Sequence, residues 1–454
     1  MKVSVVILAA GNSKRMYSNL PKILHKIANY PLISYVIDVA TTLSPTQIIS
    51  IINPNHTTVI DFLDKFHPNT VLCSQETPLG TGHAILCSLP LISQDAEYVI
   101  ILFGDTPFIT QKTLNKLLDS LKENPNYVLG VLGFRTNNPG EYGRLVIQNS
   151  QLISIIESKD LTPNQTTNNL CNSGVMVIKR DKLTELITSI NNNNHQNEFY
   201  LTDLVKIATN KNYICTYLEA VEEEVLGIND KAQLAYAEKT QQHKLRKKFL
   251  TQGVILLDPD NVTFSYDTVI NRDVIIHPYV VFGTKVEVEN NVEIKSFCHI
   301  EGATLKPHTT IGPFARIRHN SIIETYSKIG NFVEVKNSHI AHNSKINHLS
   351  YIGDATIGYN TNIGAGTITC NYDGLHKHKT TIGNNVFIGS NSSLIAPLII
   401  SDNSLIGAGS TININIPKNA LAIARTPTKI INEGSIKFQN KSQSKNHTKS
   451  ESDA

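Results

Sequence analysis

The dipeptide Ile-Gly recurs through the second half of this 454-residue chain at a spacing that very few folds can use. The gaps between its occurrences are five, six or close to multiples of six residues, a period that neither a helix nor an ordinary sheet requires. An aliphatic residue at every sixth position points the same way on successive flat strands, as in a parallel β-helix of hexapeptide coils. The pattern predicts that fold, with stacked coils that bury a continuous aliphatic core. The isoleucines of these dipeptides are at positions 311, 329, 352, 357, 363, 382, 388 and 406.

The limits and the corners of this β-helix can also be predicted. Hexad phrases begin loosely at Val262, become regular by Ile311 and end near Ile416. We expect the glycine or other small residue after each aliphatic residue to let the corner turn tightly, because glycine adopts backbone angles that other residues avoid. Together with the residues on either side of the hexads, the β-helix domain is expected to occupy residues 251–432.

The first half of the chain has a different pattern, in which short β-branched runs alternate with helical stretches. This order is typical of a Rossmann-like α/β domain with a mostly parallel sheet and helices on both faces, here residues 1–228. Ligands of such sheets bind in the loops at the carboxyl ends of the strands. We predict strands at 3–8, 47–52, 70–73, 98–103 and 127–134, and helices at 33–43, 83–89 and 111–121.

Two further segments complete the chain. Residues 229–250 contain no glycine or proline and many good helix formers, which predicts a connecting helix between the two domains. The tail at 433–454 is polar, has almost no aliphatic residues and is predicted to be disordered.

The composition of the chain excludes several classes of protein. A formal net charge of +3 is too small to indicate a nucleic-acid partner. The first apolar run, which has about eight residues, is too short to span a bilayer, so we expect no membrane insertion. Six scattered cysteines lack the spacing of a disulfide framework or a zinc site. We therefore expect a cytoplasmic protein with reduced thiols.

A candidate phosphate-binding loop follows the first predicted strand. Gly11 precedes small polar residues, and Arg15 and Lys22 add two positive charges to the same loop. Backbone N–H groups beside a glycine can approach a phosphate closely. The motif is neither a Walker loop nor a dinucleotide fingerprint, because both of those glycine patterns are absent. By its spacing alone, a plain solvated loop explains the same residues.

Asp105 is a candidate ligand for a metal ion, because it directly follows a strongly apolar predicted strand. A carboxylate at that position can hold Mg²⁺, a hard cation that prefers oxygen ligands and few protein contacts. The more ordinary role of an aspartate after a strand is to cap the next helix. The residue by itself leaves both interpretations open.

These residues resemble the L-x-x-G-x-G-T-x-M…P-K signature of nucleoside-diphosphate-sugar pyrophosphorylases, although Ser13 and Lys14 replace the usual Gly-Thr. The resemblance implies nucleotidyl transfer from UTP, in which Arg15 and Lys22 stabilise charge on the transferring phosphorus. The run EFYLTD at 198–203 is a further marker of that family. The implied ligands of Mg²⁺ are Asp105 and Asn229, and those of the nucleotide and sugar are Leu8, Gly11, Lys22, Gln75, Gly80, Thr81, Gly143, Glu157, Asn172 and Asn229.

Polar residues interrupt the hexads in the middle of the predicted β-helix. The run TITCNYDGLHKHKTT at 367–381 breaks the hexad phase, so it should project as a loop, and a loop with these side chains is typical of a site. His348, by contrast, lies in a regular hexad, where a histidine is ordinarily a surface residue. An imidazole also suits a general base, because its ordinary pKa lies near the operating pH.

The phrases IGPFARIR, GNFVEVK, HLSYIGDA and NIGAGTITCNYDG resemble the acetyltransferase half of the bifunctional bacterial enzymes that make UDP-N-acetylglucosamine. The two resemblances together span roughly residues 3–430 and imply a left-handed parallel β-helix. They imply that His348 takes a proton from the amino group of glucosamine-1-phosphate, with acetyl-CoA as the acetyl donor. Asn320 and Asn347 stand where the family often has glycine. The implied sugar-phosphate contacts are Arg318, Lys336, Tyr351, Asn362, Asn371, Tyr372 and Lys377, and the implied acetyl-CoA contacts are Ala365, Ser390, Ala408 and Arg425.

The chain is therefore expected to acetylate glucosamine-1-phosphate and then to join N-acetylglucosamine-1-phosphate to UMP from UTP, with release of pyrophosphate. Hexapeptide acyltransferases generally form trimers, so a homotrimer is expected. One alternative is a single-activity sugar nucleotidyltransferase with a structural or regulatory β-helix, against which His348 and the NYDG loop argue. A second is a non-catalytic relative of the translation-factor exchange subunits, which share this domain order. The residues that argue against it are Arg15, Lys22, Asp105 and Asn229.

Overall fold

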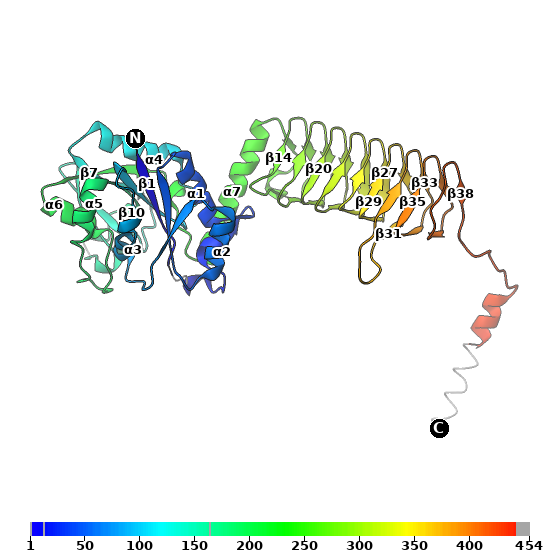
Figure 1. Ribbon diagram of the computed structural model, residues 1–454, viewed down its shortest axis with the longest axis horizontal. Helices are drawn as coiled ribbons and strands as arrows, with labels where there is room; N and C mark the ends of the chain where they lie inside the picture. Colours follow the sequence, from blue (N-terminus) through cyan, green and yellow to red (C-terminus); the bar gives the residue numbers. More distant parts are fainter. Residues whose placement is uncertain (1, 12–13, 163–164, 442–454) are drawn as a thin grey trace, which may run out of the picture. The chain divides into compact units, whose positions relative to one another are not determined.

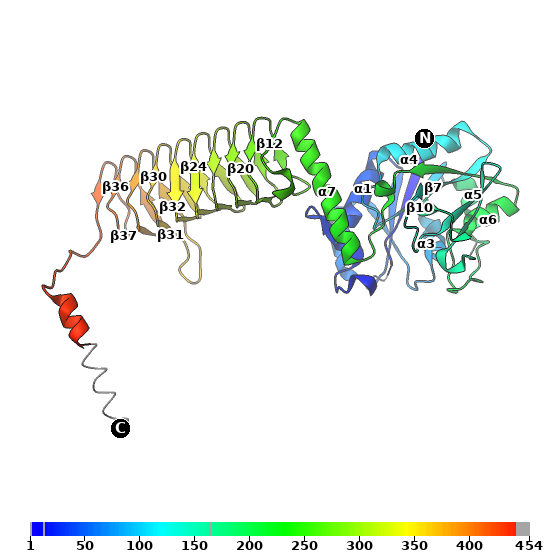
Figure 2. The same ribbon diagram turned by 180° about the vertical axis from the view of Figure 1, so that it is seen from behind.

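The computed structural model divides into two compact units, which Figures 1 and 2 show in ribbon form. The first unit extends to Lys248 and also includes Thr263–Tyr266, and the second contains Phe249–Val262 and the chain from Asp267 onward. Among the residues that are described, no helix has both the length and the apolar character needed to cross a bilayer. The described residues are 2–11, 14–162 and 165–441.

The first unit is built on one sheet whose principal strands run in the order β11-β7-β10-β6-β1-β4-β5. Strands β6, β1, β4 and β5 are parallel, and β11 is parallel to β7, but β10 is antiparallel to both of its neighbours. A hairpin of β8 (Arg144–Gln148) and β9 (Gln151–Ile156) joins this sheet at β10. The principal strands are β1 (Val3–Leu8), β4 (Gln47–Ile52), β5 (Thr70–Ser74), β6 (Tyr98–Phe103), β7 (Tyr127–Arg135), β10 (Leu170–Lys179) and β11 (Ile214–Ala220).

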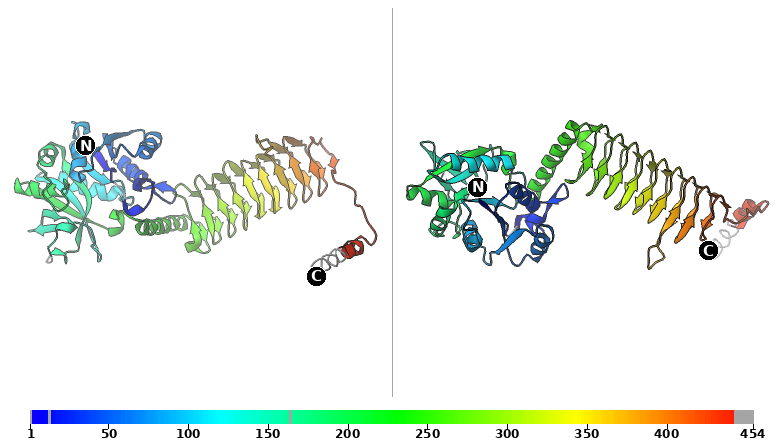
Figure 3. Two further views of the ribbon diagram at one scale, coloured as in Figure 1. Left: turned by 90° about the horizontal axis from the view of Figure 1, so that it is seen from below. Right: turned by 45° about the horizontal axis from the view of Figure 1, so that its top comes forward.

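Helices cover both faces of this sheet, so the unit has two apolar cores (Figure 3). Successive residues of β1 face opposite cores: Val5 packs with α1, α2 and α4, whereas Val6 packs with α3, α5 and α6. Burial on both faces explains why the sequences of the central strands are nearly continuous runs of apolar residues. The helices are α1 (Leu32–Thr42), α2 (Thr57–Phe66), α3 (Thr81–Ser88), α4 (Gln111–Glu123), α5 (Arg180–Ile187), α6 (Asp203–Asn210) and α7 (Lys231–Thr251).

The predicted elements of the first unit agree closely with the structure. Strands β1, β4 and β6 have the predicted bounds, β5 and β7 continue one residue further, and α1, α3 and α4 match within two residues at each end. The sequence pattern does not predict β10, because the polar run Asn-Ser-Gly interrupts its apolar residues. The pairing of β10 with β7 shifts register between Asn172 and Met176, so these polar residues occupy an irregularity in the strand.

Helix α7 corresponds to the predicted connecting helix. Its Ala237 packs with Phe108 and Ile228 in a small buried cluster. Gln242 is buried and forms two hydrogen bonds with the main chain of Phe264, donating to the carbonyl oxygen (2.7 Å) and accepting from the N–H (2.8 Å). These hydrogen bonds hold Thr263–Tyr266 to the first unit.

The second unit is a three-sided parallel β-helix, which confirms the prediction from the hexads. Each coil gives one short strand to each of three parallel sheets, which have ten, nine and eight strands within the described residues. A buried row of isoleucines runs along the ten-stranded sheet from Ile276 to Ile406, each paired with the isoleucine one coil further on. The coils begin at β12 (Ile255–Leu256), earlier than the expected Val262, and reach β38 (Leu421–Ala422).

Apart from Gly312, whose φ is 88°, the glycines after the isoleucines have a different role from the predicted one. Left-handed φ angles at the corners fall largely on other residues, many of them asparagine, such as Asn337 (47°) and Asn343 (56°). Asparagine adopts this region more readily than most residues. A Cβ atom at Gly330 would instead lie 1.9 Å from the carbonyl oxygen of Asn347 in the next coil. Glycine is therefore needed there for close approach of successive coils and not for the turn.

Two ladders of side chains run along the outer edges of the β-helix. One is aromatic: Tyr279, Phe297, Phe314 and Phe332 stack with ring centroids 4.9, 4.8 and 5.1 Å apart, and about half of each side chain is exposed. We call these four residues the aromatic ladder. The other ladder consists of exposed asparagines whose side chains bond from coil to coil. Its members are Asn343, Asn360, Asn385, Asn403 and Asn419.

The phase break in the hexads produces the predicted loop. Strand β31 (Ile368–Cys370) keeps its place in the nine-stranded sheet, and residues 371–379 then project from the β-helix (Figure 1). At the end of the chain, residues 434–441 form a helical segment. The rest of the tail for which disorder is predicted, 442–454, lies outside the described residues.

Candidate active sites

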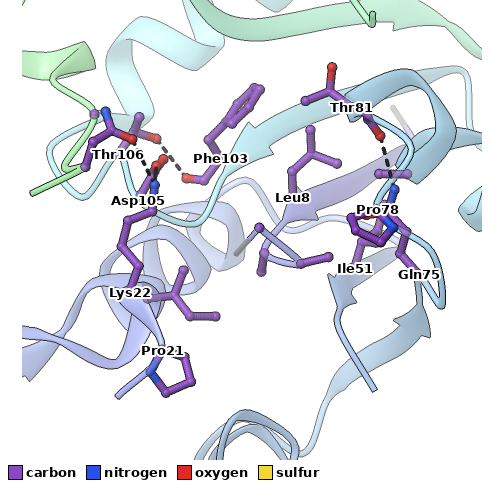
Figure 4. Close-up of a pocket in the computed structure, with 18 of the residues that line it drawn as sticks. Leu8, Pro21, Lys22, Ile51, Gln75, Pro78, Thr81, Phe103, Asp105 and Thr106 are labelled. Atoms are coloured by element: carbon purple, nitrogen blue, oxygen red, sulfur yellow. Dashed lines mark hydrogen bonds and ion pairs between the residues drawn. The ribbon is translucent and has the colours of Figure 1, made fainter. Parts of the chain in front are cut away.

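A pocket of about 600 Å³ opens at the carboxyl ends of β1, β4 and β6, where the α/β pattern predicts a ligand site. Figure 4 shows Lys22 and Asp105 on one side of this pocket and Gln75 and Thr81 on the other. The sequence-predicted residues that line it are Leu8, Gly11, Lys22, Gln75, Gly80, Thr81, Asp105 and Asn229.

One side of the pocket holds a cation between two side-chain oxygens, and we call Lys22, Asp105 and Asn229 the Lys22 cradle. The Lys22 ammonium forms an ion pair with the Asp105 carboxylate and donates a hydrogen bond to Asn229 Oδ1 (3.0 Å). The Lys22 and Asp105 side chains are only 17% and 15% exposed. Asp105 does not cap the next helix, because the N-cap of α4 is Thr110, whose side chain accepts from Thr113 N–H. The two oxygens converge on one positive charge.

The other side of the pocket is built around Gln75, which is almost fully buried. Its side-chain amide donates to the carbonyl oxygen of Gly80 (3.1 Å) and lies 3.1 Å from His83 Nδ1. Gly80 has a left-handed φ of 109°, and a Cβ atom there would lie 2.6 Å from the carbonyl oxygen of Phe199. The loop can therefore take this shape only with glycine at position 80.

The run EFYLTD at 198–203 acquires a physical role in the structure. The main chain of Phe199 donates to Leu79 O (2.8 Å) and accepts from Gly82 N–H (2.7 Å), so it clamps the loop that carries Gly80. Three residues later, Thr202 Oγ1 donates to Glu157 Oε1 (2.8 Å). The segment therefore connects the loop of Gly80 to the predicted sugar-binding carboxylate.

The three predicted sugar contacts lie together, but outside the lining of the 600 Å³ pocket. Asn172 N–H donates to Gly143 O (2.8 Å), and a Cβ at Gly143 would lie 3.5 Å from Glu157 Oε2. Burial raises the pKa of the Glu157 carboxyl, and the hydrogen bond from Thr202 opposes that rise. Their chain neighbours Tyr142 and Ser173 do line the pocket, so the three residues are adjacent in the chain or by contact to its lining.

Arg15, the other predicted catalytic cation, lies at the surface and pairs with an acidic residue. Its guanidinium forms an exposed ion pair with Glu141 and is not part of the pocket lining, whereas Lys14 is. Ser13, the other departure from the family signature, lies outside the described residues. The main chain on both sides of Glu141 is held by Arg144. Its buried guanidinium donates to Tyr142 O, Pro139 O (3.5 Å) and Gly140 O (3.4 Å).

Several residues of the pocket are absent from the sequence prediction. Most of them are chain neighbours of predicted residues, and that proximity is the signal that could have found them. His56 is the exception, because it comes from a segment with no phosphate or sugar motif, whereas Glu198 opens the marker run 198–203, to which the sequence assigned no contact. The lining residues in question are Lys14, His56, Thr106, Tyr142, Ser173 and Glu198.

The second unit brings His348 and the four predicted acetyl-CoA contacts into one row. His348 ends β27 (Lys345–His348), and its carbonyl oxygen accepts from Gly366 N–H (3.4 Å) beside Ala365. In the next coils, Ala365 O accepts from Asn391 N–H (2.7 Å) and Ser390 O from Gly409 N–H (2.8 Å). Arg425 Nη1 then donates to Ala408 O (2.7 Å). The members of this row, here named the His348 row, are His348, Ala365, Ser390, Ala408 and Arg425.

The predicted sugar-phosphate contacts form a separate polar cluster, which lies along the nine-stranded sheet. Lys336 Nζ lies 3.6 Å from Asp354 Oδ2, and the Asn371 side-chain amide donates to the same carboxylate and to Tyr351 Oη (3.5 Å). The neighbouring ammonium of Lys336 lowers the pKa of Lys377. Arg318 Nη1 bonds Glu334 Oε1 at 2.8 Å. We call Arg318, Lys336, Tyr351, Asn371 and Lys377, with Asp354, the cationic cluster.

One predicted contact lies on another sheet, a second lies at the exposed edge of the cluster, and two acidic residues of the cluster region were not predicted. Asn362 is in β30 (Asn362–Ile363) of the ten-stranded sheet, between Lys345 and Phe387. Tyr372 is exposed on the projecting loop, where it pairs with Lys377. Glu334 and Asp354 escape prediction because they stand inside matched phrases without any distinctive spacing.

Comparisons with known proteins extend to both units. A model of the MobA-like NTP transferase domain matches residues 5–157, and a model of bacterial transferase hexapeptide repeats matches residues 379–413. The bifunctional protein GlmU of Paramagnetospirillum magneticum is 44% identical over 93% of this chain and 94% of its own. The chain belongs to the bifunctional GlmU family. The GlmU of Wolbachia pipientis wMel is 45% identical over 92% of this chain and 96% of its own.

Membership of the GlmU family agrees with both folds. The nucleotidyltransferase unit precedes the hexapeptide β-helix, which is left-handed as in that class of transferase. Among solved structures, the CTP complex of CMP:2-keto-3-deoxy-manno-octonic acid synthetase covers 54% of this chain and 100% of its own, with 16% identity and a TM-score of 0.42. That likeness is too slight to carry any argument here.

Proposed function

We propose that this GlmU-family chain makes UDP-N-acetylglucosamine at two separate sites. The pocket of the first unit transfers uridylyl from UTP to N-acetylglucosamine-1-phosphate, and the β-helix transfers acetyl from acetyl-CoA to glucosamine-1-phosphate. The observation that carries this proposal is the presence of both the Lys22 cradle and the His348 row in one chain that matches its relatives over nearly its whole length.

Uridylyl transfer in the first unit requires little covalent work from the protein. A phosphate oxygen of the sugar attacks the α-phosphorus of UTP, and pyrophosphate leaves. Lys22 supplies a positive charge beside the pocket, and Gln75 and Thr81 hold the loop that faces the base. The sugar group lies toward Glu157 and Asn172. The rate enhancement comes from positioning and from stabilisation of the charge that develops in the transition state.

The oxygens of Asp105 and Asn229 fit a magnesium ion, because they already converge on the ammonium of Lys22. No group of three or more histidine, cysteine or acidic side chains that could hold a metal occurs in the described part of the chain. Mg²⁺ suits such a sparse set, since it commonly retains waters and binds through one or two carboxylates together with substrate phosphates. When bound, it neutralises charge on those phosphates.

Acetyl transfer in the β-helix uses the His348 row and the cationic cluster. Arg318, Lys336 and Lys377 provide positive charges for the sugar phosphate. The amino nitrogen of glucosamine-1-phosphate attacks the thioester carbonyl, His348 takes a proton from that nitrogen, and the thiol of CoA leaves. The small residues of the row leave room for the donor to lie against the main chain.

The β-helix is proposed to act as a homotrimer with each acetyl-transfer site between neighbouring subunits. Two observations support this: the aromatic ladder exposes a continuous apolar edge, and the His348 row and the cationic cluster belong to different sheets. Sedimentation equilibrium should give three times the chain mass for the wild type. Phe314→Glu should reduce that mass and acetyl transfer together while uridylyl transfer continues. A wild-type monomer with full acetyl transfer would refute the trimer.

A split assay on the purified chain tests the proposed function directly. One reaction contains glucosamine-1-phosphate and acetyl-CoA and is followed by release of free thiol. The other contains N-acetylglucosamine-1-phosphate, UTP and Mg²⁺ and is followed by release of pyrophosphate, with chelator added as the control for the metal. Both products are expected, and only pyrophosphate release should stop with chelator. Pyrophosphate without thiol would reduce the β-helix to a scaffold.

A further inference from the structure

Asn331 directly contacts the proposed general base. Its side-chain oxygen Oδ1 lies 2.6 Å from His348 Nδ1, although the two residues are 17 positions apart in the chain. Asn331 is partly buried at the end of β24 (Lys328–Asn331) and lies in the matched phrase GNFVEVK, which by itself assigns it no role. Within the described residues, this contact is the only hydrogen bond made by the side chain of either Asn331 or His348.

The backbone holds these two residues in register. Strands β24 and β27 have four residues each, whereas the other described strands of the β-helix have two or three. The two extra positions pair Asn331 with His348 as direct neighbours across the parallel ladder. Leu349 N–H also donates to Asn331 O at 3.0 Å. The close approach of the coils at Gly330 leaves this pairing little freedom, because the carbonyl of Asn347 fills the space beside it.

This contact determines which ring nitrogen carries the proton. An amide oxygen only accepts hydrogen bonds, so the nitrogen that faces it must be protonated. In a neutral imidazole, a proton on Nδ1 leaves the lone pair on Nε2, at the outer end of the ring. A general base needs that lone pair to point at the proton it removes. The geometry thus selects the tautomer and the orientation that the proposed acetyl transfer requires.

We propose that Asn331 is a positioning residue for acetyl transfer, which holds His348 in the Nδ1-protonated tautomer with Nε2 directed at the amino group of the sugar. This inference rests on the proposed acetyltransferase activity of the β-helix. Asn331 acts through His348 and touches neither substrate. Its effect should therefore fall on kcat, while the KM for glucosamine-1-phosphate stays unchanged.

Two substitutions test the role of Asn331 in the full-length protein. Asn331→Ala removes the acceptor, and we expect kcat for acetyl transfer to fall about 10-fold to 100-fold, the usual effect of losing a partner that orients a functional histidine. Asn331→Asp keeps an acceptor at Nδ1 and adds a negative charge, so kcat should recover most of this loss. The added charge favours the imidazolium form of the ring that faces it. The acid limb of the kcat/KM profile should therefore move to higher pH.

Controls separate this role from a purely structural one. Asn347→Ala removes an amide from the residue next to His348 on the same strand and should leave kcat and the pH profile as in the wild type. Uridylyl transfer by every variant reports whether the chain is folded and should be unchanged. A merely structural asparagine would not show a loss of kcat with alanine that aspartate restores, because only a partner of Nδ1 is replaced by a second acceptor.

The possible outcomes distinguish the inference from the proposed function. Wild-type kcat in Asn331→Ala, or a pH profile unmoved in Asn331→Asp, would overturn the role of Asn331 while acetyl transfer itself stands. Loss of kcat in Asn331→Ala with an upward shift of the acid limb in Asn331→Asp supports it. If the wild-type protein releases no thiol from acetyl-CoA, the proposed acetyl transfer fails and the inference fails with it.

Discussion

Replacement of His348 by alanine is expected to lower acetyl transfer by about 10²-fold to 10⁴-fold, the usual contribution of a general base. The amino group of glucosamine-1-phosphate must lose a proton as it attacks the thioester, and His348 is the proposed base that takes this proton. Uridylyl transfer should remain at the wild-type rate, because that reaction uses the pocket of the first unit. Thiol release and pyrophosphate release, measured on one preparation, give both rates.

His342→Ala is the matched control for this variant. His342 is an exposed histidine of the same β-helix, where it stacks on Tyr359 at a centroid distance of 5.2 Å, and it belongs to neither proposed site. It should retain both activities. A folded His348→Ala protein that lost both activities would contradict two independent sites, and one with undiminished thiol release would remove His348 from the role of base.

Replacement of Lys22 by alanine should have the opposite pattern. We expect uridylyl transfer to fall about 10²-fold to 10³-fold, the range found when one preorganised group that stabilises transition-state charge is lost. Lys22 is the cation held between Asp105 and Asn229 at the edge of the pocket. Acetyl transfer should continue unchanged. The measurement is the rate of pyrophosphate release at saturating UTP, beside the rate of thiol release.

Lys26→Ala provides the comparison for Lys22→Ala. Lys26 is four residues further along the chain, exposed on β2 (Lys26–Ile27), and lies outside the pocket lining. Its loss should change neither rate. If Lys22→Ala kept normal pyrophosphate release, the cradle would be structural, and the non-catalytic alternative for the first unit would gain support.

Much of the fold can be predicted because its signals are local and periodic. The runs at β4 and β6 are mostly apolar and are followed by Asn53 and Gly104, so their ends follow from hydropathy. The run at β1 is also mostly apolar, and the motif that begins at Gly11 indicates where it stops. The hexads specify stacked coils in the same way. Strand β10 escapes prediction because its middle is polar, and only the shifted pairing between Asn172 and Met176 shows how a strand accommodates such residues.

The sites can be predicted only in part, for a related reason. Lys22 and Asp105 stand in recognisable motifs, but Thr202, Glu334 and Asn331 act on residues that are far away in the sequence. The partner of Asn331 lies one coil later, and no local pattern connects the two positions. Sequence also cannot say that Arg15 pairs with Glu141, because side-chain direction depends on a loop from another part of the fold.

The regular spacing of the coils fixes the distance between any two positions along the β-helix. Four strand steps separate the coil of His348 from the coil of Arg425, through β30, β33 (Phe387–Ile388), β36 (Leu405–Ile406) and β38. At about 4.8 Å for each step, this distance is about 19 Å. A donor anchored at Arg425 must carry its acetyl group across that length to meet the base. In the proposed site, the number of coils therefore sets the length of acyl carrier that can react.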